Sequence, residues 1–125
     1  MRKLTLVLAL VVVMVPLFAA AAFAANQIIQ CAGIPCIATG RSDLVYERKG
    51  NHLNDRILLR GGNDQVLANK YTADRDVIRG GSGYDLIYVN DGDRHDRVRA
   101  GGGNDKCYVD ARSEAVSGCA AVIVR

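Results

Sequence analysis

A phased series of aspartates constrains this 125-residue chain more than any other feature of its sequence. Each aspartate is followed two positions later by an apolar residue, and the intervals between successive aspartates alternate between 9 residues and 11 or 12. The aspartates therefore fall into two rows with a spacing of 20 or 21 residues. The first row is Asp43, Asp64, Asp85 and Asp105, and the second row is Asp55, Asp76 and Asp96. Such a period is typical of a solenoid that stacks coil on coil.

Each half of the period predicts one short strand and one turn. The apolar residue two positions after the aspartate is valine or isoleucine in every case but Cys107, as a buried strand position favours. Glycines precede the first-row aspartates at 61–62, 80–81, 83 and 101–103, where they permit the positive φ of a sharp turn. We therefore predict an all-β fold, a parallel β-roll or β-solenoid of about three coils over residues 43–110 with disulfide-pinned ends.

The segment over residues 79–88 reads Arg-Gly-Gly-Ser-Gly-Tyr-Asp-Leu-Ile-Tyr. It resembles the Gly-Gly-x-Gly-x-Asp-x-apolar-x nonapeptide of the repeats-in-toxin, or haemolysin-type, calcium-binding proteins. Residues 100–105 match this pattern with Ala100 in place of the first glycine, and residues 59–64 keep only its second half. The ends with their cysteines are similar to those of small secreted bacterial members of the group. The resemblance implies a β-roll whose successive glycine turns hold calcium between them.

Two calcium sites are expected on the first row, one between the turns that end at Asp64 and Asp85, and one between those that end at Asp85 and Asp105. Calcium takes six to eight oxygen ligands, which aspartates and turn carbonyls can supply. The expected site residues are Gly61, Asn63, Asp64, Gly80, Ser82, Gly83, Asp85, Gly101, Gly103, Asn104 and Asp105. The same residue types also build turns without metal, so a metal-free coil is the alternative. The second row is less favoured, because its loops contain lysine or arginine and few glycines.

The N-terminal segment predicts a secretory signal peptide over residues 1–24. Met1-Arg2-Lys3 is basic, an apolar stretch follows, and Ala22-Phe23-Ala24 provides small residues for cleavage. A retained membrane anchor is the alternative, since the stretch approaches the length of a spanning helix. Removal of the leader reduces the formal net charge from +3 to about +1. This near-neutral balance gives no reason to expect nucleic-acid binding, and no membrane contact is expected after cleavage.

Four cysteines lie beyond the predicted leader: Cys31, Cys36, Cys107 and Cys119. Export to an oxidising compartment predicts two disulfides, and the sequence allows three pairings. Cys31–Cys36 and Cys107–Cys119 are favoured because each pair is local to one end of the chain. A zinc site is the alternative, but neither spacing matches a zinc finger. Residues 25–42 and 111–125 are expected to cap the two ends of the solenoid, the latter with a closing strand over residues 120–124.

No catalytic arrangement is predicted, and we expect a binding protein rather than an enzyme. His52 and His95 fall in separate loops, and no spacing links either to a serine and an aspartate as a triad would require. Two outward stripes are expected instead. Tyr46, Leu67, Tyr88 and Tyr108 should form a ladder that stabilises neighbouring strands or contacts carbohydrate. Arg56, Arg79, Arg97 and Arg99 should form a solvated face or bind an acidic cell-surface or extracellular polymer.

Overall fold

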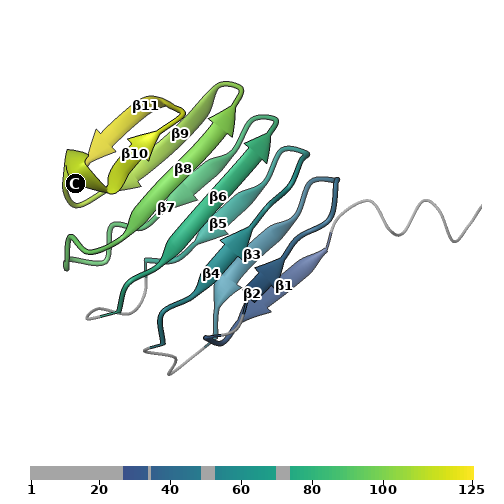
Figure 1. Ribbon diagram of the computed structural model, residues 1–125, viewed down its shortest axis with the longest axis horizontal. Helices are drawn as coiled ribbons and strands as arrows, with labels where there is room; N and C mark the ends of the chain where they lie inside the picture. Colours follow the sequence, from purple (N-terminus) through teal and green to yellow (C-terminus); the bar gives the residue numbers. More distant parts are fainter. Residues whose placement is uncertain (1–26, 34, 49–52, 70–73) are drawn as a thin grey trace, which may run out of the picture.

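In a computed structural model, which describes residues 27–33, 35–48, 53–69 and 74–125, the chain forms a β-solenoid of about four turns (Figure 1). The predicted leader and His52 lie outside these residues. The elements are β1 (Ile28–Cys31), β2 (Pro35–Ile37), β3 (Leu44–Glu47), β4 (Arg56–Leu58), β5 (Gln65–Leu67), β6 (Val77–Ser82), β7 (Leu86–Tyr88), β8 (Arg97–Gly102), β9 (Asp105–Val109), the 3₁₀ helix η1 (Arg112–Glu114), β10 (Ala115–Ser117) and β11 (Cys119–Val124).

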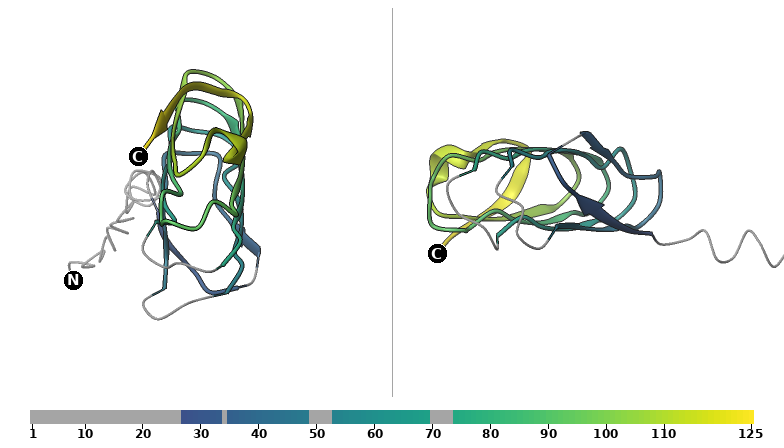
Figure 2. Two further views of the ribbon diagram at one scale, coloured as in Figure 1. Left: turned by 90° about the vertical axis from the view of Figure 1, so that its left-hand side faces the viewer. Right: turned by 90° about the horizontal axis from the view of Figure 1, so that it is seen from below.

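Odd-numbered and even-numbered strands form two separate parallel sheets. The six-stranded sheet has the order β1-β3-β5-β7-β9-β11, and the five-stranded sheet has the order β10-β8-β6-β4-β2. Viewed along the stack, the coils superpose as a flattened loop with one sheet on each long side (Figure 2, left). The prediction of an all-β parallel solenoid is confirmed. The stack is about one turn longer than predicted, because β1 and β2 pair in register with β3 and β4.

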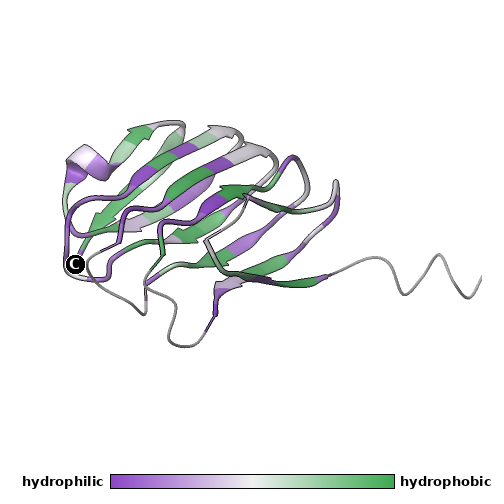
Figure 3. Cartoon of the chain, turned by 60° about the horizontal axis from the view of Figure 1, so that its bottom comes forward, coloured by the Kyte–Doolittle hydropathy of each residue, from purple (hydrophilic) through white to green (hydrophobic). Residues whose placement is uncertain are grey.

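The core consists of the side chains that point inward from both sheets. The residues two positions after each aspartate are all fully buried: Val45, Ile57, Val66, Ile78, Ile87, Val98 and Cys107. Along the strands these inward residues alternate with more polar outward ones, which Figure 3 shows as alternating bands of hydropathy. The period-two pattern of the sequence therefore places the core correctly.

Both favoured disulfides are present. Cys31–Cys36 joins β1 to β2 and so links the two sheets within the first coil. Cys107–Cys119 joins β9 to β11, which are neighbours in the six-stranded sheet. The second bond therefore pins a strand pair, whereas the sequence led us to expect that it would pin an end. The disulfides are consistent with folding in an oxidising compartment. Among the described residues, no helix has the length and hydropathy needed to cross a membrane.

The chain passes from one sheet to the other along two edges. The glycine edge, at the upper side of Figure 1, holds the turns that lead into β3, β5, β7 and β9, and it carries the first row of aspartates. The loop edge, at the lower side, leads into β4, β6, β8 and β10 and carries the second row. Glu114 occupies the next position of the second row, directly before β10.

Candidate metal centres

The aspartates of both rows hold adjacent coils together. In the first row, Oδ1 of Asp64 accepts a hydrogen bond from the backbone N–H of Asp43 at 2.7 Å, and Oδ1 of Asp85 accepts one from Asp64 at 3.0 Å. In the second row, Oδ1 of Asp96 accepts one from Asp76 at 2.7 Å. Hydrogen bonds to charged groups contribute about 1.5–3 kcal/mol each. One oxygen of each of these carboxylates thus has a structural role that needs no metal.

The glycines of the first row also have a role in stacking. Gly83 and Gly103 have φ values of 126° and 127°, and a Cβ at either position would overlap the carbonyl oxygen of the equivalent glycine one coil earlier. Gly81 and Gly101 are left-handed as well, and Arg60, which stands at the equivalent position of the preceding turn, keeps this conformation with a φ of 71°. The replacement of glycine by Arg60 therefore leaves the backbone path of that turn unchanged.

At the glycine edge, the structure places the predicted ligands in a continuous stack with one aspartate in each coil. Oδ2 of Asp64, Asp85 and Asp105 is buried and has no hydrogen-bond partner. Burial is the main cause that raises the pKa of Asp64 and of Asp85 to about 6. Among the described residues, however, no group of three carboxylates converges at this edge. Further ligands here would have to be groups other than carboxylates, such as turn carbonyls or the side-chain oxygens of Ser82 and Asn104.

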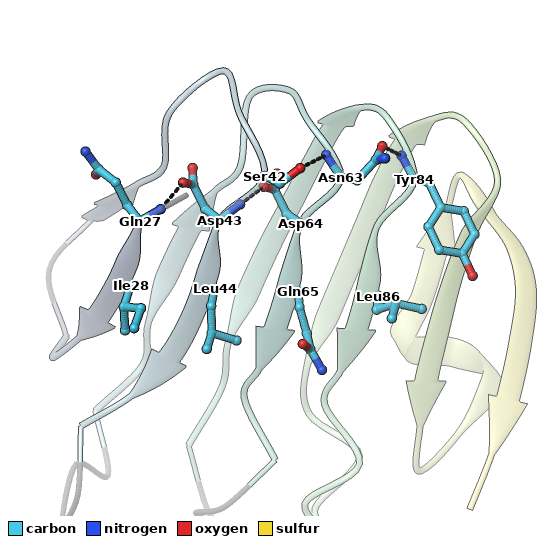
Figure 4. Close-up of a pocket in the computed structure, with 10 residues that line it drawn as sticks. All are labelled: Gln27, Ile28, Ser42, Asp43, Leu44, Asn63, Asp64, Gln65, Tyr84 and Leu86. Atoms are coloured by element: carbon cyan, nitrogen blue, oxygen red, sulfur yellow. Dashed lines mark hydrogen bonds between the residues drawn. The ribbon is translucent and has the colours of Figure 1, made fainter. Parts of the chain in front are cut away.

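The side chain of Asn63 belongs to a second ladder on the same edge. Its backbone N–H donates to Oγ of Ser42 at 3.4 Å, and its Oδ1 accepts a hydrogen bond from the N–H of Tyr84 at 2.9 Å (Figure 4). These residues line an open depression of about 340 Å³ near the first coils. The hydrogen bond from Tyr84 indicates that Asn63 helps to align the turns.

At the loop edge, by contrast, carboxylates from different coils converge. Within the described residues there are four groups whose ligand atoms all lie within 4.8 Å of one another. The groups are Glu47–Asp55–Asp76, Asp74–Asp76–Asp96, Asp74–Asp91–Asp93 and Asp93–Asp96–Glu114. Because the groups share members, they form a continuous band of eight carboxylates, which we call the acidic band.

Asp76 and Asp96 lie at the centre of this band. They are 0% and 2% exposed, and Oδ2 of each is buried without a hydrogen-bond partner. Burial, with the neighbouring carboxylates as a second cause, raises the pKa of Asp76 to about 8 and that of Asp96 to about 9. An unpaired carboxylate is costly to bury unless it is protonated or coordinates a metal. Two buried oxygens directed into one acidic group therefore fit a divalent cation.

The described basic residues of these loops do not pair with the buried Oδ2 atoms of Asp76 and Asp96. Arg75 and Arg94 are exposed, and the ion pair between described residues at this edge joins Nδ1 of His95 to Asp93 at 3.6 Å. Lys49 and Lys70 lie outside the described residues. Among the described residues, the centre of the band is therefore buried away from the exposed basic side chains.

None of the eight residues of the acidic band is among the expected site residues. Asp55, Asp76 and Asp96 were assigned to the less favoured second row, and the other five, Glu47, Asp74, Asp91, Asp93 and Glu114, to no expected site. Asp74 and Asp76 stand two positions apart, as do Asp91 and Asp93, and each pair precedes a strand of the five-stranded sheet. This repeated spacing of two aspartates could have indicated a metal site. The carboxylates come together, however, only when the coils stack in register. Glu114 follows Asp96 by 18 residues and continues the second row with a longer side chain.

No protein-family model, curated protein or solved structure matches the chain.

Proposed function

We propose that this protein is an exported, non-catalytic β-solenoid whose coils are ordered by bound calcium. The observation that carries the proposal is the pair of buried, unpartnered Oδ2 atoms of Asp76 and Asp96. Together with Asp74 they provide three carboxylates from two successive coils. Asp91 and Asp93 extend the ligand set through Asp74. A cation at this place would join neighbouring coils and offset the mutual repulsion of the carboxylates.

The chemistry of the donors favours calcium over softer metals. All candidate ligands in the acidic band are carboxylates, and the cysteines are joined in disulfides. Hard cations prefer such oxygen donors, and calcium tolerates irregular geometry and high coordination numbers better than magnesium. The resemblance of residues 79–88 to the repeats-in-toxin nonapeptide supports the same ion. We therefore propose membership of that group, with the loop edge as the principal site and the glycine edge as a second.

Export is proposed from the predicted leader and the two disulfides. Calcium outside cells is abundant enough to saturate weak sites, and extracellular modules bind it with dissociation constants of about 10⁻⁴–10⁻³ M. Because the ligands converge only when coils stack, binding would be coupled to folding. The protein would thus become fully ordered after it leaves the cell.

The proposal is tested by thermal unfolding of the oxidised protein, without its leader, in chelator and in 10 mM calcium. For a dissociation constant of about 10⁻⁴–10⁻³ M, linkage gives roughly 2 kcal/mol of stabilisation, or about 10 °C for a chain of this size. The double variant Asp76→Asn, Asp96→Asn keeps both Oδ1 acceptors and removes two ionisable carboxyl groups. We expect it to lose the calcium shift and to be at least as stable as the wild type in chelator.

Asp85→Asn is the matched control. Asp85 is also fully buried, has the same type of hydrogen bond along its row and has an unpartnered Oδ2, but it lies on the glycine edge. We expect this variant to keep most of the shift. If Asp85→Asn lost the calcium-dependent shift in melting temperature and the double variant kept it, the principal calcium site would be assigned to the glycine edge. A wild-type protein that melts at the same temperature in both buffers would refute calcium ordering altogether.

A further inference from the structure

The outward face of the five-stranded sheet carries four exposed arginines. Arg56 projects from β4, Arg79 from β6, and Arg97 and Arg99 from β8. The residues that alternate with them, including Ile57, Ile78 and Val98, point into the core. We call this set of four side chains the arginine face.

Strand register brings the four arginines together. Arg79 is directly opposite Arg99 on the neighbouring strand, and Arg56 and Arg97 lie on either side of Val77 in one row across the sheet. Neighbouring strands are about 4.8 Å apart, so the whole set spans only two strand spacings. Residues far apart in the chain therefore form one compact cationic surface.

Among the described residues of this sheet, no acidic side chain compensates the charge of the arginine face. Apart from glycines, the other residues of this sheet that are not buried are Pro35, Ile37, Leu58, Val77, Ser82, Ala115, Val116 and Ser117, none of which is acidic. Within the described part of the chain, none of the four arginines forms an ion pair with a carboxylate. Like charges directly opposite each other destabilise a sheet. The pair Arg79–Arg99 therefore costs stability in the isolated protein, and an anionic partner would relieve that cost.

The form of the surface indicates the class of partner. Guanidinium groups bind carboxylates, sulfates and phosphates with two parallel hydrogen bonds. A depression of about 260 Å³ lies between Val77, Arg97 and Arg99, and Val77 offers it an apolar contact for a sugar ring. The outward positions of β4, β6 and β8 carry no aromatic side chain on which a nucleic-acid base could stack. A charged, non-aromatic sheet face with this depression suits an extended polymer with an anionic group on each sugar.

We propose that the arginine face binds an acidic polysaccharide, with Arg79, Arg97 and Arg99 pairing with successive anionic groups and Val77 contacting a ring. This role goes beyond calcium ordering, because the face lies on the outside of the sheet and the acidic band lies along the loop edge. The polymer would run across the strands, parallel to the direction in which the coils stack.

The test measures binding of the oxidised protein to dextran sulfate at low and moderate salt, with neutral dextran as the uncharged comparison. The variant Arg79→Gln, Arg99→Gln should bind dextran sulfate about tenfold more weakly, since two exposed ion pairs of up to about 1 kcal/mol each are removed. The control variant Lys106→Gln, Arg112→Gln removes the same charge from exposed positions on β9 and η1. It should bind within about twofold of the wild type.

Equal losses in the two variants would show that net charge alone attracts the polymer, and would overturn the assignment to this face. Tighter binding of single-stranded oligothymidine than of dextran sulfate would replace the polysaccharide by nucleic acid. No binding of dextran sulfate would refute the proposal. Measuring each variant in both calcium and chelator, with its melting temperature, separates this result from the calcium proposal.

Discussion

At the scale of single residues, the two oxygens of each central aspartate have different roles. Oδ1 accepts the hydrogen bond that joins two coils, whereas Oδ2 of Asp64, Asp76, Asp85, Asp96 and Asp105 is buried and unpartnered. An asparagine would supply the same Oδ1 without a buried charge. The hydrogen-bond ladder therefore explains why an acceptor recurs at these positions, and the unpartnered Oδ2 is the feature that points to a cation.

A prediction at this scale separates the packing role of the glycines from metal binding. Gly103→Ala should destabilise the protein by about 3 kcal/mol even in chelator. The new Cβ would sit at a φ of 127° and overlap the Gly83 carbonyl oxygen, and backbone strain and overpacking cost about 1–3 kcal/mol each. The measurement is urea unfolding of the chelated protein.

The neighbouring glycine provides the control. A Cβ on Gly102 would meet nothing within 4 Å, so Gly102→Ala should change stability by no more than about 0.5 kcal/mol. If both variants were equally stable in chelator, close packing of the coils would not explain the glycine pattern. If Gly103→Ala lowered the free energy of unfolding only in the presence of calcium, Gly103 would be needed for calcium binding.

At the scale of elements, strands that follow an aspartate could be predicted, and those at the start of the stack could not. β4, β5 and β7 are three-residue strands centred on the predicted inward residue. β1 has no aspartate before it, because no earlier coil donates a hydrogen bond to that position. The first coil only donates: the N–H of Gln27 donates to Oδ1 of Asp43 at 3.0 Å. At the other end, the longer Glu114 accepts from the N–H of Asp96 at 3.3 Å.

The candidate site was harder to predict than the strands. Each group of the acidic band combines residues from different loops, and those loops differ in length. Periodicity fixes which strands are neighbours, but it does not determine where a loop side chain lies within its turn. The glycine signature directed attention to the first row, although its glycines are explained by coil-to-coil contact.

The second disulfide allows a prediction about a single element. Since Cys107–Cys119 joins β11 to β9, Cys107→Ala with Cys119→Ala should destabilise chiefly β11. Closing a loop of this size contributes about 3 kcal/mol by chain-entropy arguments. Amide hydrogen exchange should accelerate in β11 and stay nearly unchanged in β5 and β7. Uniform acceleration throughout the solenoid would contradict a local role, and Cys31→Ala with Cys36→Ala is the comparison at the other end.

At the scale of the whole molecule, the buried carboxylates and the arginine face lie in different places. The buried carboxylates follow the edges, where they face one another, and the arginine face lies on the outside of the five-stranded sheet. The small net charge of the chain conceals this division. The repulsion within the acidic band therefore acts on the fold itself, and its strength should depend on pH.

In chelator, stability should fall as pH rises from about 5 to about 9. Folding raises the pKa values of Asp64 and Asp85 to about 6, of Asp91 to about 7, of Asp76 to about 8 and of Asp96 to about 9. In the unfolded chain these groups lose their protons near pH 4. The folded state thus holds more protons over this interval, and linkage requires that unfolding become easier as they are removed. The urea midpoint measured against pH checks this.

The double variant Asp76→Asn, Asp96→Asn should flatten the upper part of that profile, above about pH 7, because its two most strongly shifted carboxyls are gone. The lower part, near pH 6, should remain, since Asp64 and Asp85 are unchanged. Calcium should flatten the wild-type profile in the same upper range, because a cation favours the ionised carboxylates that alkaline pH produces. A wild-type midpoint in chelator that rose between pH 5 and pH 8 would mean that the acidic band is neutralised by other means, and calcium would then have no repulsion to relieve.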